Sequence, residues 1–148
     1  MTGERRLVLD ANILMRAVLG RRVRQIIETH VERAAFFAPD VALVDARQHL
    51  PDVVRKRGGD DAAIAAALDL LGAVSLNVDE FGAEAYEAHR RAALARIEKR
   101  DPDDWPIVAT AMALDCPVWT EDQDFFGAGL PTWTTDRVEI YLADHEFR

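Results

Sequence analysis

Short runs of apolar residues alternate along the chain with longer stretches in which apolar positions recur every three or four residues. The short runs have the length and composition of buried strands, and they lie at residues 6–9, 35–38, 74–78, 118–120 and 131–134. The longer stretches have the period of amphipathic helices. Strands that alternate with helices predict a three-layer α/β/α protein whose central, mostly parallel sheet has about five strands.

The helical stretches are predicted at residues 13–20, 21–31, 40–50, 62–71, 81–100, 103–114 and 138–143. Local signals set several of these limits. Asn12 is free to cap the first helix, and Gly20 and Gly72 are interpreted as helix ends. Pro51 disturbs the third helix because proline removes an amide donor from a helix interior, whereas Pro106 is tolerated in a first turn.

Length and composition bound the class of protein. A chain of 148 residues, 49% of them hydrophobic, can bury a core without disulfide bonds, so we expect a single domain over residues 1–148. Cys116 is the only cysteine and cannot pair within the chain, which fits a reducing compartment. No apolar run approaches the roughly 18 residues that a transmembrane helix needs. These features predict a cytoplasmic protein that does not insert in a membrane.

Four aspartates are predicted to meet at one edge of the sheet. Asp10 ends the first strand and Asp122 follows the fourth. Asp104 begins a helix, and Asp45 lies on a helix that can lean over the same edge. In open α/β sheets this edge, at the carboxyl ends of the strands, is where ligands bind. Taken singly, each aspartate also fits a helix cap, a turn or a surface position.

A cluster of carboxylates at this edge predicts a divalent cation, because crowded carboxylates repel one another unless a cation is present. Mg²⁺ and Mn²⁺ prefer oxygen ligands, and either ion can activate a bound water for attack on a phosphodiester. The net charge of −8 alone would argue against a protein that holds nucleic acid through phosphate contacts. A bound cation removes that objection because it presents positive charge to a phosphate.

Three segments in order along the chain resemble the motifs of PIN-domain nucleases. The segment LVLDANILM resembles the opening of these proteins, DxxIVATA at residues 104–111 their third-acid motif, and WTEDQDF their fourth-acid loop. The similarity extends over residues 7–133. The resemblance implies a compact α/β/α fold and a metal-dependent ribonuclease that cleaves single-stranded RNA. Small bacterial and archaeal members of the family include VapC-like toxins that an antitoxin protein neutralises.

The resemblance also assigns roles to particular residues. Asp10, Asp104 and Asp122 are implied to bind Mg²⁺ or Mn²⁺, and Asp45 completes the catalytic set. The family commonly has glutamate on the helix after the second strand, so Asp45 is a departure whose carboxylate reaches about one methylene less far. The residues expected to support the site are Asn12, Thr120, Asp101 and Asp124. An antitoxin protein and a second copy of the chain are the expected protein partners.

Substrate phosphates would need cationic side chains outside the acidic cluster. The candidate RNA-binding residues are Arg16, Arg21, Arg22, Arg96 and Arg100. The tryptophans have apolar neighbours and are predicted to pack in the core rather than stack on bases: Trp105, Trp119 and Trp133. The histidines lack the spacing of a zinc site and are expected at surface or boundary positions: His30, His49, His89 and His145.

Three other functions remain open. The first is a catalytically weakened PIN-like module that binds RNA or protein, with Asp45 marking the loss of activity. The second is a phospho-acceptor signalling domain, against which stand the only two lysines, Lys56 and Lys99, since neither follows a late strand. The third is an aspartyl phosphatase, which would need an aspartate two residues after Asp10, where the chain has Asn12.

Overall fold

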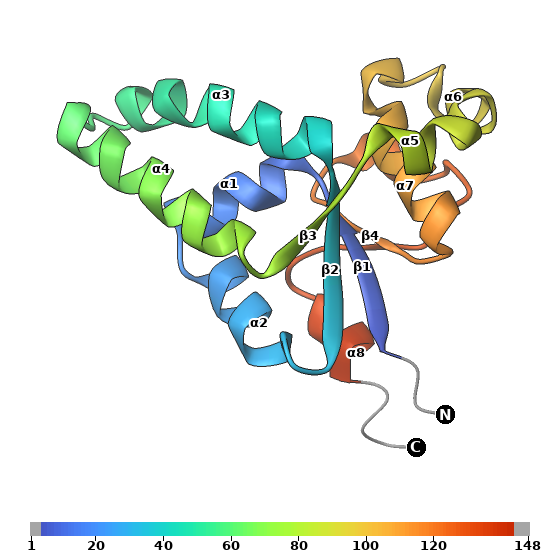
Figure 1. Cartoon of the computed structure of the whole chain (residues 1–148), viewed down its shortest axis with the longest axis horizontal. Helices are drawn as coiled ribbons and strands as arrows, with labels where there is room; N and C mark the ends of the chain where they lie inside the picture. Colours follow the sequence, from blue (N-terminus) through green and yellow to red (C-terminus); the bar gives the residue numbers. More distant parts are fainter. Residues whose placement is uncertain (1–3, 144–148) are drawn as a thin grey trace.

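A five-stranded parallel sheet forms the centre of the protein in a computed structural model, which describes residues 4–143 (Figure 1). The strands are β1 (Arg5–Leu9), β2 (Ala34–Pro39), β3 (Val78–Phe81), β4 (Val118–Trp119) and β5 (Thr132–Trp133). Their order in the sheet is β3-β2-β1-β4-β5, and every neighbouring pair is parallel. Helices flank the sheet, which confirms the predicted three-layer α/β/α fold.

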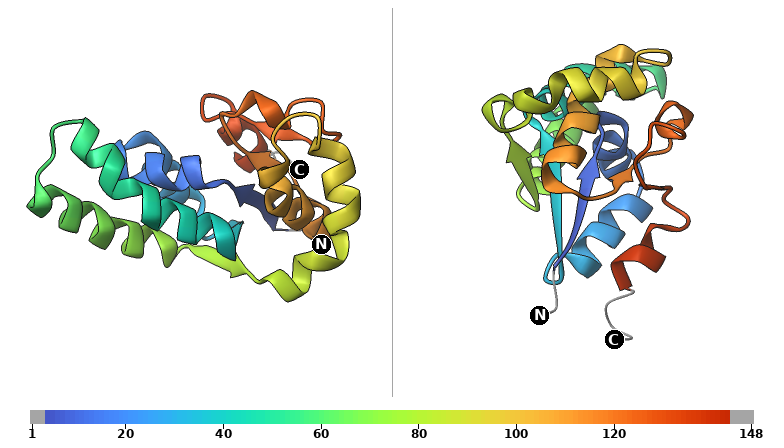
Figure 2. Two further views of the ribbon diagram at one scale, coloured as in Figure 1. Left: turned by 90° about the horizontal axis from the view of Figure 1, so that it is seen from above. Right: turned by 90° about the vertical axis from the view of Figure 1, so that its right-hand side faces the viewer.

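The first four helices are α1 (Ala11–Leu19), α2 (Arg22–His30), α3 (Asp40–Lys56) and α4 (Asp61–Ser75). Two short helices, α5 (Ala83–Tyr86) and α6 (Arg90–Ile97), precede α7 (Trp105–Leu114), and α8 (Val138–Ala143) comes last. Helices α3 and α4 lie side by side as an antiparallel pair that extends away from the sheet (Figure 2). Helices α5, α6 and α7 pack together on the other side of the molecule.

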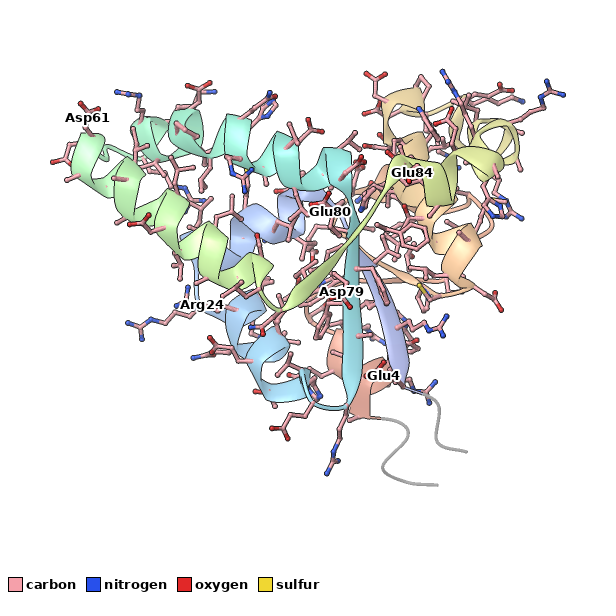
Figure 3. The ribbon with its side chains drawn as sticks, viewed as in Figure 1. Glu4, Arg24, Asp61, Asp79, Glu80 and Glu84 are labelled. Atoms are coloured by element: carbon pink, nitrogen blue, oxygen red, sulfur yellow. The ribbon has the colours of Figure 1, made fainter. Side chains whose placement is uncertain are left out.

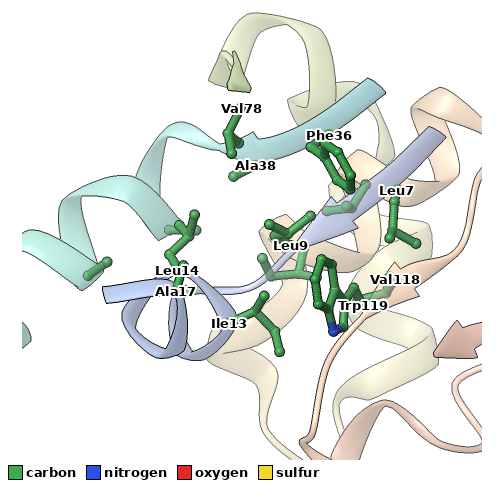
Figure 4. Close-up of a cluster of buried hydrophobic side chains, with 14 of the residues drawn as sticks. Leu7, Leu9, Ile13, Leu14, Ala17, Phe36, Ala38, Val78, Val118 and Trp119 are labelled. Carbon is green, nitrogen blue, oxygen red and sulfur yellow. The ribbon is translucent and has the colours of Figure 1, made fainter. Parts of the chain in front are cut away.

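The core lies around the two central strands. Leu7, Val8 and Leu9 of β1 are fully buried, as expected for a parallel strand that is covered on both faces. Phe36 of β2 and Trp119 of β4 pack at 6.3 Å between ring centroids, beside Leu7 and Leu9 (Figure 4). The apolar run of β1 therefore places its last residue, and the aspartate that follows, at a rigid edge of the sheet.

The third strand differs from the prediction. It spans Val78–Phe81 instead of residues 74–78, because α4 continues through Gly72 to Ser75. Leu71 and Val74 are both buried, and their spacing of three residues extends the apolar face of the helix past the glycine. The interpretation of Gly72 as a helix end was therefore wrong.

Two other helix predictions are corrected. Helix α3 runs without interruption through Pro51, and burial of Leu50 and Val54, four residues apart, holds that segment against the core. The long helix predicted at residues 81–100 is instead α5, a 3₁₀ turn at Glu87–His89 and α6. No helix within residues 4–143 is long and apolar enough to cross a membrane.

Candidate functional site

A cleft of about 760 Å³ opens at the carboxyl edge of the sheet, between the start of α1, the middle of α3 and the loop after β4. Its acidic lining residues are Asp10, Asp45, Asp104, Glu121, Asp122 and Asp124. All four of the predicted catalytic aspartates thus lie around one cleft. Other acids that contribute to the net charge, such as Asp79, Glu80 and Glu84, lie along and beside β3 (Figure 3).

Asp10 is the most buried of these acids, with 7% of its surface exposed. It is the N-terminal cap of α1, and its Oδ1 accepts a hydrogen bond from the amide of Ile13 at 2.9 Å. The cap is therefore Asp10 and not Asn12 as predicted. Burial raises the pKa of Asp10 to about 6, the bonds from Thr120 and Ile13 oppose the rise, and the charges of Asp122 and Glu121 add to it.

Thr120 links the first strand to the loop after the fourth. Its side chain is fully buried, and its hydroxyl donates to Oδ2 of Asp10 at 2.5 Å. The Oγ1 of Thr120 also accepts a hydrogen bond from the amide of Asp122 at 2.9 Å. One hydroxyl thus orients the carboxylate that follows β1 and the backbone of the loop that carries Asp122.

The Thr120→Val substitution is expected to lower the free energy of unfolding by about 1–3 kcal/mol, because it leaves two polar groups at the cleft without their partner. Urea denaturation at pH 7 measures this change. Thr120→Ser keeps the hydroxyl and serves as the control, with a smaller loss. Equal stability of the valine variant and the wild-type protein would contradict the bridging role.

Asp104 is the last residue of the 3₁₀ turn Pro102–Asp104 and the N-terminal cap position of α7. Partial burial raises its pKa to about 7, and the negative charges of Asp101, Asp122, Asp10 and Asp124 raise it further. The site thus disfavours the ionised forms of two carboxyl groups that lie on separate elements, Asp10 and Asp104. Groups with such shifts in a cleft are typical of functional sites.

Asp45 lines the cleft from α3, and His49 lies one helical turn further along the same face. The Nδ1 of His49 is 2.9 Å from the carbonyl oxygen of Asp45, which can only accept, so Nδ1 donates this hydrogen bond. His49 is exposed, as expected of a surface or boundary position, but its place at the cleft was not predicted. The spacing of four residues between Asp45 and His49 was the signal that could have revealed it.

The predicted supporting residues have different surroundings. Asn12 and Asp124 line the cleft, and the amide of Asp124 donates to Oδ1 of Asp122 at 2.9 Å. Asp101 does not line the cleft; its Oδ1 accepts from the amide of Asp103 at 3.1 Å, and its charge acts on Asp104. Asp101 therefore shapes the turn before α7.

The five candidate RNA-binding arginines separate into two groups. Arg16 lines the acidic cleft, and Arg16, Arg21 and Arg22 line a second cavity beside it. Arg96 instead donates to the carbonyl oxygens of Ala128 and Gly129, at 3.2 and 3.0 Å. A side chain at Gly129, where φ is +81°, would collide with the Arg96 guanidinium. Arg96 thus holds the 126–130 loop.

Arg100 lies against the same loop, because a Cβ atom built on Gly127 would come within 2.8 Å of its guanidinium. It lines neither the acidic cleft nor the cavity beside it. The structure therefore gives Arg96 and Arg100 a place beside the 126–130 loop, apart from the other three arginines.

The tryptophans pack as predicted. Trp119 is fully buried, Trp133 stacks on Tyr141 at 5.8 Å between centroids, and Trp105 meets Tyr86 edge-on at 5.5 Å. Of the other histidines, His30 is buried and its Nε2 is 2.9 Å from Oε2 of Glu139. His89 lies in the 3₁₀ turn between α5 and α6, and His145 lies outside the described residues.

The fold and the cleft together define a class: an α/β/α domain whose acids gather at the carboxyl edge of a parallel sheet. The profile of the PIN domain family matches residues 8–143. The chain belongs to the PIN domain family. A comparison with curated protein sequences finds no significant match.

Solved structures share this fold at low sequence identity. PAE2754 from Pyrobaculum aerophilum is 17% identical, with a TM-score of 0.71 over 97% of this chain and 98% of that one. VapBC2 from Rickettsia felis, bound to a DNA fragment from its promoter, is 13% identical, with a TM-score of 0.66 over 87% and 98%. A toxin–antitoxin complex from Klebsiella pneumoniae is 18% identical, with a TM-score of 0.61 over 87% and 97%.

Proposed function

We propose that this protein is a metal-dependent endoribonuclease that hydrolyses phosphodiester bonds in single-stranded RNA. The observation that carries the proposal is that Asp10 and Asp104 line one cleft, that each has a raised pKa, and that the charge of Asp10 contributes to the shift of Asp104. Within residues 4–143 no lysine or arginine forms an ion pair with either carboxylate. Such a site has negative charge that a divalent cation would neutralise.

The donor set fits Mg²⁺ or Mn²⁺, because every acidic group around the cleft offers carboxylate oxygens. Asp10, Asp104 and Asp122 would hold the ion, and it would supply an activated water and a positive charge beside the scissile phosphate. In the part of the chain described by the structure, no three such side chains are already arranged to hold an ion. Binding would therefore require rotation of the acidic side chains toward Asp10.

The chain's own groups would have distinct tasks. Thr120 and the amide of Ile13 fix the carboxylate of Asp10, so this acid is the preorganised member of the set. Asp45 and His49 on α3 would orient the attacking water or the phosphate from the opposite wall of the cleft. Because Asp45 reaches less far than a glutamate, contact through a water is expected.

The cellular role proposed is that of a single-domain, cytoplasmic toxin that an antitoxin protein neutralises. Support comes from the family and from structural neighbours that are toxin–antitoxin complexes, including those from Rickettsia felis and Klebsiella pneumoniae. A homodimer is a further proposed state. Coexpression with the product of an adjacent small reading frame, followed by copurification, tests the partner.

A cleavage assay tests the nuclease proposal. The purified protein is expected to cut a labelled single-stranded RNA when millimolar Mn²⁺ or Mg²⁺ is present and to stop when EDTA is added, because the acids alone cannot activate water. No cleavage of varied RNA pools with either ion would contradict the proposal. Binding of RNA without cleavage would favour the alternative, a catalytically weakened PIN-like binding module.

A further inference from the structure

A second cavity, of about 430 Å³, lies between the junction of α1 with α2 and the end of α3. Four arginines surround it: Arg16, Arg21, Arg22 and Arg57. Its floor is apolar and consists of Met15, Leu19, Val23 and Val53. We call this cavity the arginine pocket. Its size falls within the range of about 300–1,000 Å³ that is typical of small-molecule sites.

Three of the four guanidinium groups in the arginine pocket have no anionic partner among residues 4–143. Among residues 4–143, no carboxylate forms an ion pair with Arg16, Arg21 or Arg57. Arg22 by contrast pairs with Glu139 at 3.2 Å. In a chain of net charge −8, a group of cations left unneutralised indicates an anionic ligand.

An arginine close to the arginine pocket is not necessarily left without a partner, as the neighbouring Arg24 shows (labelled in Figure 3). Its guanidinium donates to the carbonyl oxygens of Ala17 and Gly20, at 2.9 and 3.3 Å. Arg24 therefore caps the C-terminal end of α1, and its guanidinium is occupied by these backbone oxygens instead of being open to a ligand. The arginines that line the arginine pocket are exposed, and they have no such contacts to the backbone.

The arginine pocket is continuous with the acidic cleft. Asn12, Met15 and Arg16 line both cavities. On α1, Asn12, Met15, Arg16 and Leu19 follow one face of the helix, which rises about 10 Å over seven residues. A strand with one phosphate beside Asp10 would therefore place an adjoining nucleotide over the arginine pocket.

We propose that the arginine pocket binds a nucleotide that flanks the scissile phosphate, an inference that rests on the proposed nuclease function. The base would lie on the apolar floor, and the phosphates would contact Arg16, Arg21 and Arg57. Arginine is suited to this because its planar guanidinium binds phosphate oxygens in pairs. Asn12 and Thr135, which also line the arginine pocket, offer polar groups to the edge of the base.

An acidic peptide would also meet the guanidinium groups, but the surroundings favour RNA. A peptide that continued from the arginine pocket into the cleft would bring its carboxylates against Asp10, Asp104 and Asp122, which repel them. A nucleic acid strand has a phosphate to offer at the same place, where a bound cation would receive it. The apolar lining residues Met15, Leu19, Val23 and Val53 also suit the flat face of a base, whereas a run of acidic side chains would leave them uncovered.

The binding test compares two double variants that each remove two positive charges. Arg21→Ala with Arg57→Ala removes pocket arginines, whereas Arg47→Ala with Arg91→Ala removes exposed arginines that do not line the cleft or the arginine pocket. All proteins carry Asp10→Asn and are kept in EDTA, so that an eight-nucleotide fluorescent RNA stays intact. Fluorescence anisotropy measures its Kd over a range of salt, and melting temperatures check the fold.

The pocket variant is expected to weaken RNA binding by about tenfold for each arginine removed. It should also lower the slope of log K against log salt by about 1.4, since two phosphate contacts in a single strand are lost. The control should stay within about twofold in Kd at low salt. Equal affinity of the two double variants would overturn the inference. So would a loss of affinity for an oligoglutamate peptide without a loss for RNA.

Kinetics in the wild-type background separate this inference from the nuclease proposal. The pocket variant is expected to raise KM and to leave kcat within about threefold, because the arginines hold a part of the substrate that does not react. Weaker RNA binding in a protein that cleaves no RNA would support the arginine pocket and contradict the nuclease proposal. Unchanged affinity and KM in a protein that does cleave would overturn the arginine pocket alone.

Discussion

The Asp10→Asn variant is expected to lose metal-dependent RNA cleavage by about a thousandfold or more. Metal catalysis contributes several kcal/mol of transition-state stabilisation, and each 1.4 kcal/mol or so is tenfold in rate. Asparagine keeps an oxygen that can accept from the Ile13 amide, so the cap of α1 survives. The change removes the charged ligand that Thr120 orients, and it leaves the fold in place.

Single-turnover cleavage of a labelled RNA with saturating Mn²⁺ measures this loss. Asp79→Asn is the matched control, because Asp79 is an exposed acid on β3 that lies outside the cleft (Figure 3). It removes the same charge by the same chemical change and should keep the wild-type rate. If Asp10→Asn cleaved as fast as Asp79→Asn, the carboxylate of Asp10 would have no part in the reaction.

The second large effect is on stability. Without divalent ions, the free energy of unfolding is expected to fall as the pH rises from about 4 to 7. The folded protein holds a proton on Asp10 with a pKa of about 6, against 3.8 for the unfolded chain. Between these values the folded state binds more protons, so raising the pH favours unfolding. The shift corresponds to a loss of at most about 3 kcal/mol.

Asp104 acts in the same direction, since its pKa is raised to about 7 and its stabilising protonated form is lost as the pH rises through that value. Mn²⁺ is expected to restore stability above pH 7, by RT ln(1 + [L]/Kd), or about 2.7 kcal/mol at a hundred times Kd. Below pH 5 the gain should shrink, because protonated carboxyl groups are poor ligands.

Urea denaturation of wild type and Asp10→Asn at several pH values, in EDTA and in Mn²⁺, measures both effects. The variant cannot ionise at position 10, so its stability in EDTA should fall less between pH 4 and 7. Titrating groups remote from Asp10 behave alike in the two proteins and cancel in the difference, whereas the pKa of Asp104, which the charge of Asp10 raises, should also be less raised in the variant. The same slope in both proteins, together with no response of the wild type to Mn²⁺, would contradict the proposed site.

Local patterns in the sequence predicted most of the sheet. Strands β1, β2, β4 and β5 were found because an apolar run between turn residues is a local signal. β3 was misplaced because the alternation at residues 74–78 also fits the last turn of a helix, and the burial of Leu71 and Val74 decided for the helix.

Sequence alone was sufficient for the fold class, the family resemblance and the placement of four aspartates around one cleft, because strand ends follow from periodicity and the motifs of the family are local. The tertiary structure decided which side chains accompany them. It placed His49 beside Asp45, directed Arg96 to the 126–130 loop, and brought Arg57 from the end of α3 to Arg16 and Arg21. Asp45 and His49 are only four residues apart on α3, but the other neighbours are far apart along the chain, so their contacts depend on how the elements pack, which no local pattern contains.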